Sequence, residues 1–213
     1  TARGRICHEG PPMSISTARY LASFHPKKVP HFFTDILVVG GGLAGMRAAL
    51  EAAHSLSVLV VTKDGLQASN SAHAQGGIAA VLGPEDRFED HAADTLIAGG
   101  ALCDPEVVRS VVEEAPRRIV ELVEWGTKFD QIGSRLALTR EGGHSHNRIV
   151  HALGDATGKE LMRAVIARVL QAPNISIWQN TFLIDLVTHN GSCVGAGLEP
   201  PPLLSPRRCP FQQ

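Results

Sequence analysis

The stretch that decides the fold runs from Asp35 to Lys63 and reads DILVVGGGLAGMRAALEAAHSLSVLVVTK. Its β-branched and aliphatic residues from Ile36 to Gly40 predict a buried strand, and the apolar run from Ser57 to Thr62 predicts a second strand. The Ala- and Leu-rich segment between them, Leu43 to Ser55, predicts a helix. We therefore expect a β-α-β unit of a Rossmann-like α/β fold.

A glycine motif lies where the first strand meets the helix. Gly40, Gly42 and Gly45 form G-x-G-x-x-G, in which the glycines suit a tight turn, close approach to a pyrophosphate and helix–sheet packing, respectively. The helix N-terminus adds free N–H groups and a partial positive charge. The alternative is a glycine turn without a ligand, but a motif inside a β-α-β unit favours a dinucleotide site. The second strand ends in Thr62 and Lys63, without the acid that usually holds the ribose of NAD, which disfavours a simple NAD site.

The composition narrows the class of protein. The 213 residues suffice for one domain with a sizeable core, and 44% apolar with 19% charged residues are typical of a globular protein. A net charge of −1 gives no electrostatic basis for binding nucleic acid or an acidic membrane, and no apolar run approaches the ~20 residues of a membrane span. The cysteines lack C-x-x-C spacing, which indicates reduced thiols in a cytoplasmic protein and argues against zinc. They are Cys7, Cys103, Cys193 and Cys209.

Three segments follow from the pattern along the chain: a lead-in at residues 1–33, a dinucleotide-binding domain at 34–198 and a Pro-rich tail at 199–213. The chain does not begin with Met, and Met13 is the first candidate start. Residues 14–31 are basic and contain no acid, which allows an organellar transit peptide, but the lack of a sustained amphipathic pattern favours a short lead-in. The tail has no periodicity, and we expect it to be disordered or non-native.

The middle of the chain predicts a helical insertion. Arg87 to Gly99 is expected to be a helix, with His91 on its surface. Asp104, followed by a proline, predicts the N-cap of a longer helix with an apolar face. Pro116 predicts a kink in that helix or a break into two, and Gly126 suits its C-terminal end.

A second helix and a short β-structure are expected after the insertion. Thr157 and Glu160 match a T-x-x-E capping box, which predicts a helix to about Gln171 with Leu161, Val165, Ile166 and Val169 facing inward. An Asn-Gly hairpin turn is expected to join two of the strands that follow. The expected strands are Ile175–Trp178, Phe182–Thr188 and Cys193–Leu198.

Two segments are chemically distinctive. Ala68 to Leu82, ASNSAHAQGGIAAVL, is small and polar and can lie flat against a ligand, and Gly76 and Gly77 permit backbone angles that other residues avoid. The alternative is an ordinary surface loop. Leu136 to His151, LALTREGGHSHNRIVH, suits a pocket wall around a small ligand. The alternatives for this second segment are a solvated hairpin or a metal site, but no Cys/His cluster completes a metal site.

Five motifs in order carry a family resemblance: VVGGGLAG, SNSAHAQGGIAA, DTLIAGGALCD, LTREGGHSHNRI and DATG. From about Thr34 to Gly197 the chain resembles the flavoproteins of succinate dehydrogenase, fumarate reductase and L-aspartate oxidase, and LTREGGHSH is most similar to the L-aspartate oxidases. The resemblance implies FAD and a Rossmann-like FAD-binding domain with a helical insertion and a β-hairpin or meander. Family members are more than twice as long, so the resemblance implies an incomplete domain without the second half of the FAD site and without the catalytic arginine.

The resemblance also implies roles for individual residues. In the respiratory members a histidine just before AQGG bonds covalently to the flavin; Asn70 stands at that position, which implies noncovalent FAD. Glu141 matches the glutamate that orients the substrate's amino group, whereas Arg140 and Arg148 receive no role from their spacing. The residues implied to contact FAD are Gly40, Gly41, Gly42, Leu43, Ala44, Gly45, Lys63, Asn70, Ser71, Ala72, His73, Ala74, Gln75, Gly76 and Gly77.

The activity implied by the resemblance is oxidation of L-aspartate to iminoaspartate, with hydride transfer to the flavin and onward electron transfer to oxygen or fumarate. This is the first step of de novo NAD biosynthesis, so quinolinate synthase is the implied protein partner. Two alternatives remain open: a succinate- or fumarate-type flavoprotein, from which Glu141 and Asn70 distinguish the oxidase, and a non-catalytic FAD-binding fragment. On its own the chain is expected to be inactive.

Overall fold

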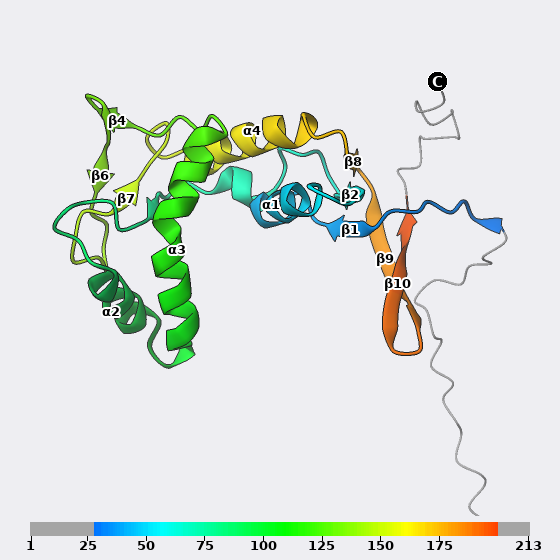
Figure 1. Ribbon diagram of the computed structural model, residues 1–213, viewed down its shortest axis with the longest axis horizontal. Helices are drawn as coiled ribbons and strands as arrows, with labels where there is room; N and C mark the ends of the chain where they lie inside the picture. The colour runs from blue at the N-terminus through cyan, green and yellow to red at the C-terminus, as the bar shows by residue number, and fades with distance from the viewer. Residues whose placement is uncertain (1–27, 200–213) are drawn as a thin grey trace, which may run out of the picture.

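The computed structural model describes residues 28–199 (Figure 1). The expectations for a disordered tail and for an organellar or basic lead-in therefore fall almost wholly outside the described residues.

The expected β-α-β unit is present. β1 (Ile36–Val39) pairs in parallel with β2 (Val58–Val61), and α1 (Leu43–Ala52) connects them, ending somewhat before the predicted Ser55. A further strand, β8 (Ile175–Trp178), pairs in parallel with the other side of β2, which gives the order β1-β2-β8. Because β2 is the central strand, all four of its residues are buried.

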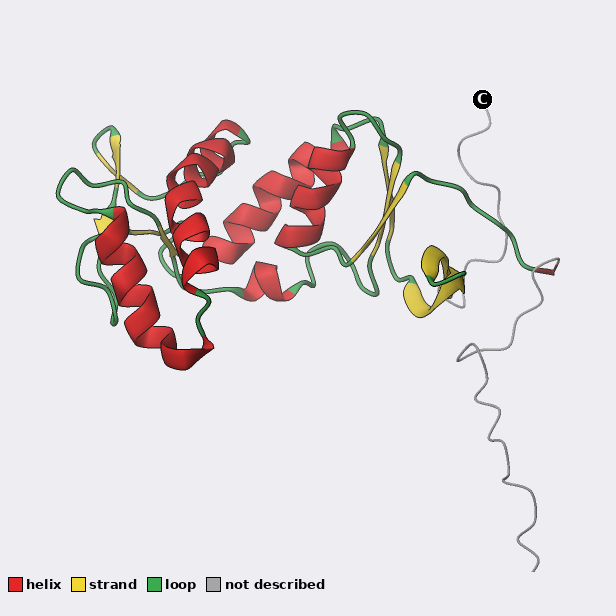
Figure 2. Cartoon of the chain, turned by 60° about the horizontal axis from the view of Figure 1, so that its bottom comes forward, coloured by secondary structure: helices red, strands yellow, loops and turns green. Residues whose placement is uncertain are grey.

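Two helices cover one side of this sheet. α4 (Thr157–Leu170) packs against α1, and Figure 2 shows both helices on the same side of the strands. Met46 of α1, Val165 and Val169 of α4 and Val60 of β2 belong to one hydrophobic core. The inward face predicted for α4 is therefore confirmed.

The sequence predicted an all-helical insertion between β2 and α4. This prediction is wrong, because the insertion also contains short strands. β3, β7 and β6 form an antiparallel sheet in the order β3-β7-β6, and β4 pairs with β5. The alternation that marks a strand is hard to detect in pairs of residues this short. The elements of the insertion are η2 (Asn70–His73), β3 (Ile78–Ala79), α2 (Phe88–Gly99), η3 (Gly100–Leu102), α3 (Pro105–Glu124), β4 (Gln131–Ile132), β5 (Arg135–Leu136), β6 (Leu138–Thr139) and β7 (Ile149–Val150).

The helix α3 continues through Pro116 as one element, so the predicted break into two helices is wrong, while the kink that was its alternative stays a prediction. Proline removes one backbone donor, but the helix extends for more than two turns on either side, and its apolar face is buried at Val112, Ile119 and Leu122. Packing of that face outweighs the local cost of the proline.

Both ends of α3 are capped as the sequence predicts. The Asp104 carboxylate accepts hydrogen bonds from the amides of Glu106 and Val107, at 3.0 and 3.3 Å. At the other end Gly126 has φ +87°, and its amide donates to the carbonyl of Val123 at 2.9 Å. This left-handed glycine closes the helix and lets the chain turn back.

An ion pair connects α3 of the insertion to α1, one of the two helices that cover the parallel sheet. The guanidinium of Arg47 on α1 binds both carboxylate oxygens of Glu121 on α3, at 3.1 and 3.0 Å, and lies 5.5 Å from the ring centre of Trp125. A two-point contact of this kind sets the angle between the two helices.

The chain ends, within the described residues, in a hairpin that projects from the sheet (Figure 1). β9 (Phe182–His189) and β10 (Ser192–Glu199) pair antiparallel, and Asn190 and Gly191 between them have φ +49° and +79°. These angles are those of the predicted Asn-Gly hairpin turn, which is confirmed. None of the helices within residues 28–199 combines the length and apolar character that crossing a bilayer requires.

Candidate dinucleotide and substrate site

The glycine loop connects β1 to α1 and is held by the neighbouring strand. The amide of Gly40, whose φ is +112°, donates to the carbonyl of Val61 at 2.8 Å. Gly45 lies so close to the carbonyl oxygen of Gly40 that a Cβ would overlap with it. The third glycine of the motif therefore does what the sequence predicts and brings α1 against the strand.

We expect Gly45→Ala to destabilise the protein, because the added methyl group forces α1 away from β1. Overpacking of this kind costs about 1–3 kcal/mol, which corresponds to a fall of roughly 2–12 °C in melting temperature. Gly65→Ala is the matched control, since a Cβ there would meet only the Gln179 side chain at an ordinary 3.7 Å. Equal melting temperatures for the two variants would contradict the role given to Gly45.

The N-terminus of α1 is open toward a negatively charged group. It has no acidic residue in its first turn, and Gly42 at the N-cap supplies no side-chain hydrogen bond. The Leu43 amide donates to the Ser71 hydroxyl at 3.1 Å. The amides of Ala44 and Gly45 have no acceptor among residues 28–199. Free amides at a helix N-terminus are the donors that bind phosphate groups in proteins.

The polar loop predicted to face a ligand packs on two helix N-termini. Besides the contact from Ser71 to α1, Gly158 at the start of α4 donates its amide to the carbonyl of Ala74 at 2.9 Å. A Cβ on Gly158 would overlap with the carbonyl oxygen of Ser71. Gly158, which belongs to the DATG motif and received no individual role from the sequence, lets α4 approach this loop.

The two glycines of AQGG differ in their surroundings. Neither Gly76 nor Gly77 has a positive φ, so the left-handed backbone angles that glycine permits are not used here. A Cβ on Gly77 would instead overlap with the side chain of Ile149 and the carbonyl of Val150. Gly77 thus permits the loop to approach β7, while Gly76 is open and exposed.

Glu141 lies in the loop between β6 and β7, and its carboxylate contacts His151, which lies beside Gly77. Its Oε1 is 3.3 Å from Nε2 of His151, which is also 3.0 Å from the hydroxyl of Thr139. The Glu141 side chain is 49% exposed, so it remains available to a ligand. His151, one of the polar residues of the segment Leu136 to His151 to which the sequence gave no individual role, therefore connects Glu141 to the Gly77 segment.

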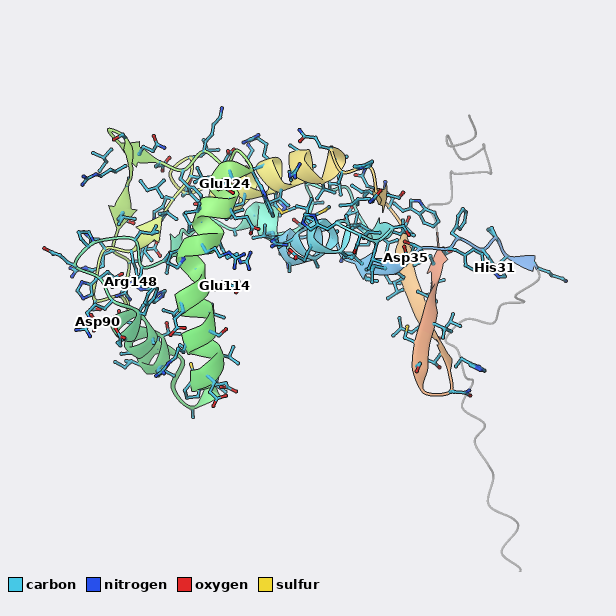
Figure 3. All side chains as sticks on the ribbon, viewed as in Figure 1. His31, Asp35, Asp90, Glu114, Glu124 and Arg148 are labelled. Atoms are coloured by element: carbon cyan, nitrogen blue, oxygen red, sulfur yellow. The ribbon has the colours of Figure 1, made fainter. Side chains whose placement is uncertain are left out.

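Arg148, to which its spacing assigned no role, is buried, and two acids balance its charge. It is therefore not available to a ligand. Its guanidinium binds both carboxylate oxygens of Asp86, at 2.9 and 2.7 Å, and one oxygen of Asp94 at 2.7 Å. Figure 3 places Arg148 beside α2, with Asp90 close by. Burial opposes a low pKa for Asp94, but hydrogen bonds from Ser145 and Arg148 outweigh it and lower that pKa. Arg140, by contrast, is exposed.

His91 is buried, so its predicted place on the surface of α2 is wrong. Its side chain faces the loop after β6, where the ring centre of His144 lies 5.8 Å away. Nδ1 of each ring is buried without a hydrogen-bond partner among the described residues. Burial, followed by the positive charge of Arg148 and the proximity of His144, lowers the pKa of His91.

We expect the protein to lose stability as the pH falls below about 6.5, the pKa of an unfolded histidine. Because the folded state lowers the pKa of His91, the unfolded chain binds a proton that the folded chain resists, and this difference favours unfolding at low pH. His91→Leu should therefore flatten the fall in melting temperature between pH 7 and pH 5. The Asp94 carboxylate contributes only at lower pH, since its pKa lies below the usual 3.8.

The control for this measurement is His54→Leu, because His54 is exposed near the end of α1. That variant should keep the pH dependence of the wild type. A His91→Leu protein that still loses stability between pH 7 and pH 5 would assign the effect to another group.

The predicted capping box of α4 is not formed, because both of its side chains bind elsewhere. The Thr157 hydroxyl accepts a hydrogen bond from the amide of Ala152 at 3.1 Å, and Ala156 is the N-cap. The Glu160 carboxylate accepts the amide of Lys128 at 2.8 Å and pairs with Arg163, which lowers the pKa of Glu160. Tertiary partners have taken the place of the local motif.

Lys63 and the possible metal ligands complete the set of predicted site residues. Lys63 follows β2, is exposed and has no hydrogen bond or ion pair within the described part of the chain. Over residues 28–199 there is no group of three or more His, Cys, Asp or Glu side chains suited to a metal ion.

A parallel α/β sheet with an open helix N-terminus after a glycine loop defines a dinucleotide-binding protein. The family model described as "FAD binding domain" matches residues 35–211. The chain belongs to this family of FAD-binding flavoproteins, which confirms FAD as the cofactor and the flavoprotein class expected from the motifs.

Similar proteins agree with this assignment. L-aspartate oxidase, chloroplastic, from Arabidopsis thaliana is 51% identical over 157 residues, which are 73% of this chain and 24% of the relative. L-aspartate oxidase from Neisseria meningitidis is 40% identical over 76% of this chain and 32% of that protein. A mutant FrdA of E. coli quinol fumarate reductase has a TM-score of 0.76 at 30% identity, with coverage of 78% of this chain and 29% of that one. The chain thus spans about a quarter to a third of these proteins.

Proposed function

We propose that this chain supplies the FAD- and substrate-binding region of an L-aspartate oxidase. The observation that carries the proposal is a continuous set of contacts from the glycine loop to Glu141. It runs from Leu43 to the Ser71 hydroxyl, along the AQGG loop to Gly77, and from there to His151 and the Glu141 carboxylate. A dinucleotide site and a carboxylate suited to an ammonium group are therefore built on one connected frame.

The residues present fit FAD. The open amides of Ala44 and Gly45 suit the pyrophosphate, and the missing Cβ of Gly42 makes room for the Ser71 hydroxyl, which a Cβ would approach to 3.2 Å. The loop from Asn70 to Gly77 would lie along the flavin, with Asn70 leaving it noncovalent. FAD, when bound, supplies the acceptor for the hydrogen removed from the substrate.

Glu141 would select an amino acid over a plain dicarboxylate. Its carboxylate can accept a charge-assisted hydrogen bond from the ammonium of L-aspartate, which succinate and fumarate lack. This contact would orient the substrate's Cα toward the flavin. Residues that clamp the substrate carboxylates and the catalytic arginine are expected from the part of such enzymes that this chain does not span.

The test uses a complete enzyme: Arabidopsis L-aspartate oxidase in which residues 34–198 of this chain replace the matching segment, referred to below as the chimera. Glu141→Gln in the chimera should lower kcat/KM for L-aspartate oxidation by roughly 10- to 150-fold, since a hydrogen bond to a charged group is worth about 1.5–3 kcal/mol. Fumarate reduction should change far less, because fumarate has no ammonium group.

Glu113→Gln is the control, because Glu113 is exposed on α3, away from this loop. It should leave both reactions unchanged. Equal losses of the two reactions in Glu141→Gln would assign Glu141 to the fold or to the flavin and would contradict the proposed specificity.

A second candidate is a fumarate- or succinate-type flavoprotein, favoured by the similarity of the fold to fumarate reductase. Glu141 argues for the oxidase, because the succinate enzymes are expected to have an apolar residue there. The third, a non-catalytic FAD-binding fragment, would bind FAD without turnover. Quinolinate synthase, which would consume iminoaspartate, remains a proposed partner on resemblance alone.

We propose a cytoplasmic location from the composition, with an organellar one as the alternative. The Arabidopsis and tobacco relatives are named chloroplastic, which supports the organellar alternative for the basic lead-in.

A further inference from the structure

His151 occupies a position that joins three segments of the candidate site. It follows β7, and because Ile78 pairs with Val150, His151 lies beside Gly77. An added Cβ on Gly77 would come within 3.0 Å of Cε1 of the His151 ring. The ring is thus packed against the AQGG loop, and its side chain is only 19% exposed.

The hydrogen bonds around the ring indicate which nitrogen carries the proton. The Thr139 hydroxyl faces the carbonyl of Ile149 at 3.4 Å, to which it can only donate. Its oxygen is then free to accept from Nε2 of His151 at 3.0 Å, which requires a proton on Nε2. Oε1 of Glu141 lies 3.3 Å from the same nitrogen, within ion-pair distance.

Glu141 has no other contact that would fix its carboxylate. It precedes Gly142 and Gly143, the latter with φ +85°, and no other hydrogen bond or ion pair of its side chain is found within residues 28–199. A glutamate next to two glycines and half exposed would otherwise sample several rotamers.

We propose that His151 is the positioning residue for Glu141. Its Nε2–H, held by Thr139 and by packing on Gly77, orients the Glu141 carboxylate toward the ammonium group of an α-amino dicarboxylate. This inference rests on the proposed function, and it assigns to His151 a part in choosing the substrate rather than in the chemical step.

The first test compares three variants of the chimera. His151→Phe keeps a ring against Gly77 but removes the donor, and it should raise KM for L-aspartate about tenfold. Inhibition by succinate, which has no ammonium, should stay within about twofold. His151→Gln restores an N–H at similar reach and should recover most of the affinity for L-aspartate. In a Glu141→Gln background, His151→Phe should add little, because the group that it positions has already lost its charge.

The second test does not depend on activity. In the 213-residue chain without FAD, the imidazole ¹⁵N shifts of His151 should show the Nε2–H form, and Glu141→Gln should move them. Arg140→Gln, next to Glu141 but without an ion pair within residues 28–199, is the control and should leave them unchanged.

Two results would overturn the proposal: equal loss of L-aspartate and succinate binding in His151→Phe, or full additivity of the two substitutions. Failure of the proposed function is a separate result. It would appear as Glu141→Gln without selective loss of L-aspartate oxidation, while the ¹⁵N shifts still report whether His151 holds Glu141.

Discussion

The 213-residue chain alone, supplied with excess FAD, should give no turnover of L-aspartate. Asn70, Gln75 and Gly76, which are proposed to line the flavin, are exposed to solvent, as is Glu141. Water is therefore not excluded from the site, and the residues proposed to clamp the substrate carboxylates are expected from the part of the Arabidopsis relative outside the 24% that this chain matches. Correct positioning can lower a barrier by ~7–11 kcal/mol, and most of that contribution would be absent.

The measurement is hydrogen peroxide released from L-aspartate, with the chimera as the positive control. Any residual rate should lie far below that of the chimera. A turnover of about 1 s⁻¹ or more, within the usual range of enzymes, would show that this region suffices for catalysis and that no arginine from elsewhere is needed.

Arg148→Met should destabilise the protein strongly, because it leaves two acids buried without their partner. The side chain of Asp86 is 2% exposed and that of Asp94 15%, so neither can recover full hydration in place. Breaking a buried ion pair by removing one partner costs about 3–5 kcal/mol. For a protein of this size the melting temperature should fall by roughly 6–20 °C.

Two further variants identify the cause of that loss. Arg140→Met changes the other arginine of the same segment, which is exposed, and should leave the melting temperature nearly unchanged. Adding Asp86→Asn to Arg148→Met removes one of the unpaired charges and should recover part of the stability. A double variant no more stable than Arg148→Met would assign the loss to packing rather than to charge.

The local patterns of the sequence predicted the framework well. The apolar runs that became β1 and β2, the Asp104 cap of α3 and the Asn-Gly turn each depend on neighbouring residues alone, and each was recovered. Gly45 of α1, which lies close to β1, was also predicted correctly, because its spacing in the glycine motif encodes this close approach.

The errors arose where distant segments compete with a local pattern. Thr157 and Glu160 have the right spacing for a capping box, but the amides of Ala152 and Lys128 bind them instead. Pro116 would end an isolated helix, and the buried face of α3 prevents this. His91 looked like a surface residue because its partners come from a loop some fifty positions later. Such contacts cannot be read from spacing in one sequence.

Asn70 stands at the start of η2, and its exposed side chain makes no hydrogen bond within residues 28–199. The backbone around it is fixed from both sides, by Ser69 capping the short helix and by Ser71 binding α1. A change of side chain at position 70 therefore leaves the frame untouched. The proposed noncovalent attachment of FAD would therefore depend on a single side chain that the fold does not need, and a substitution at position 70 would alter the attachment while preserving its support.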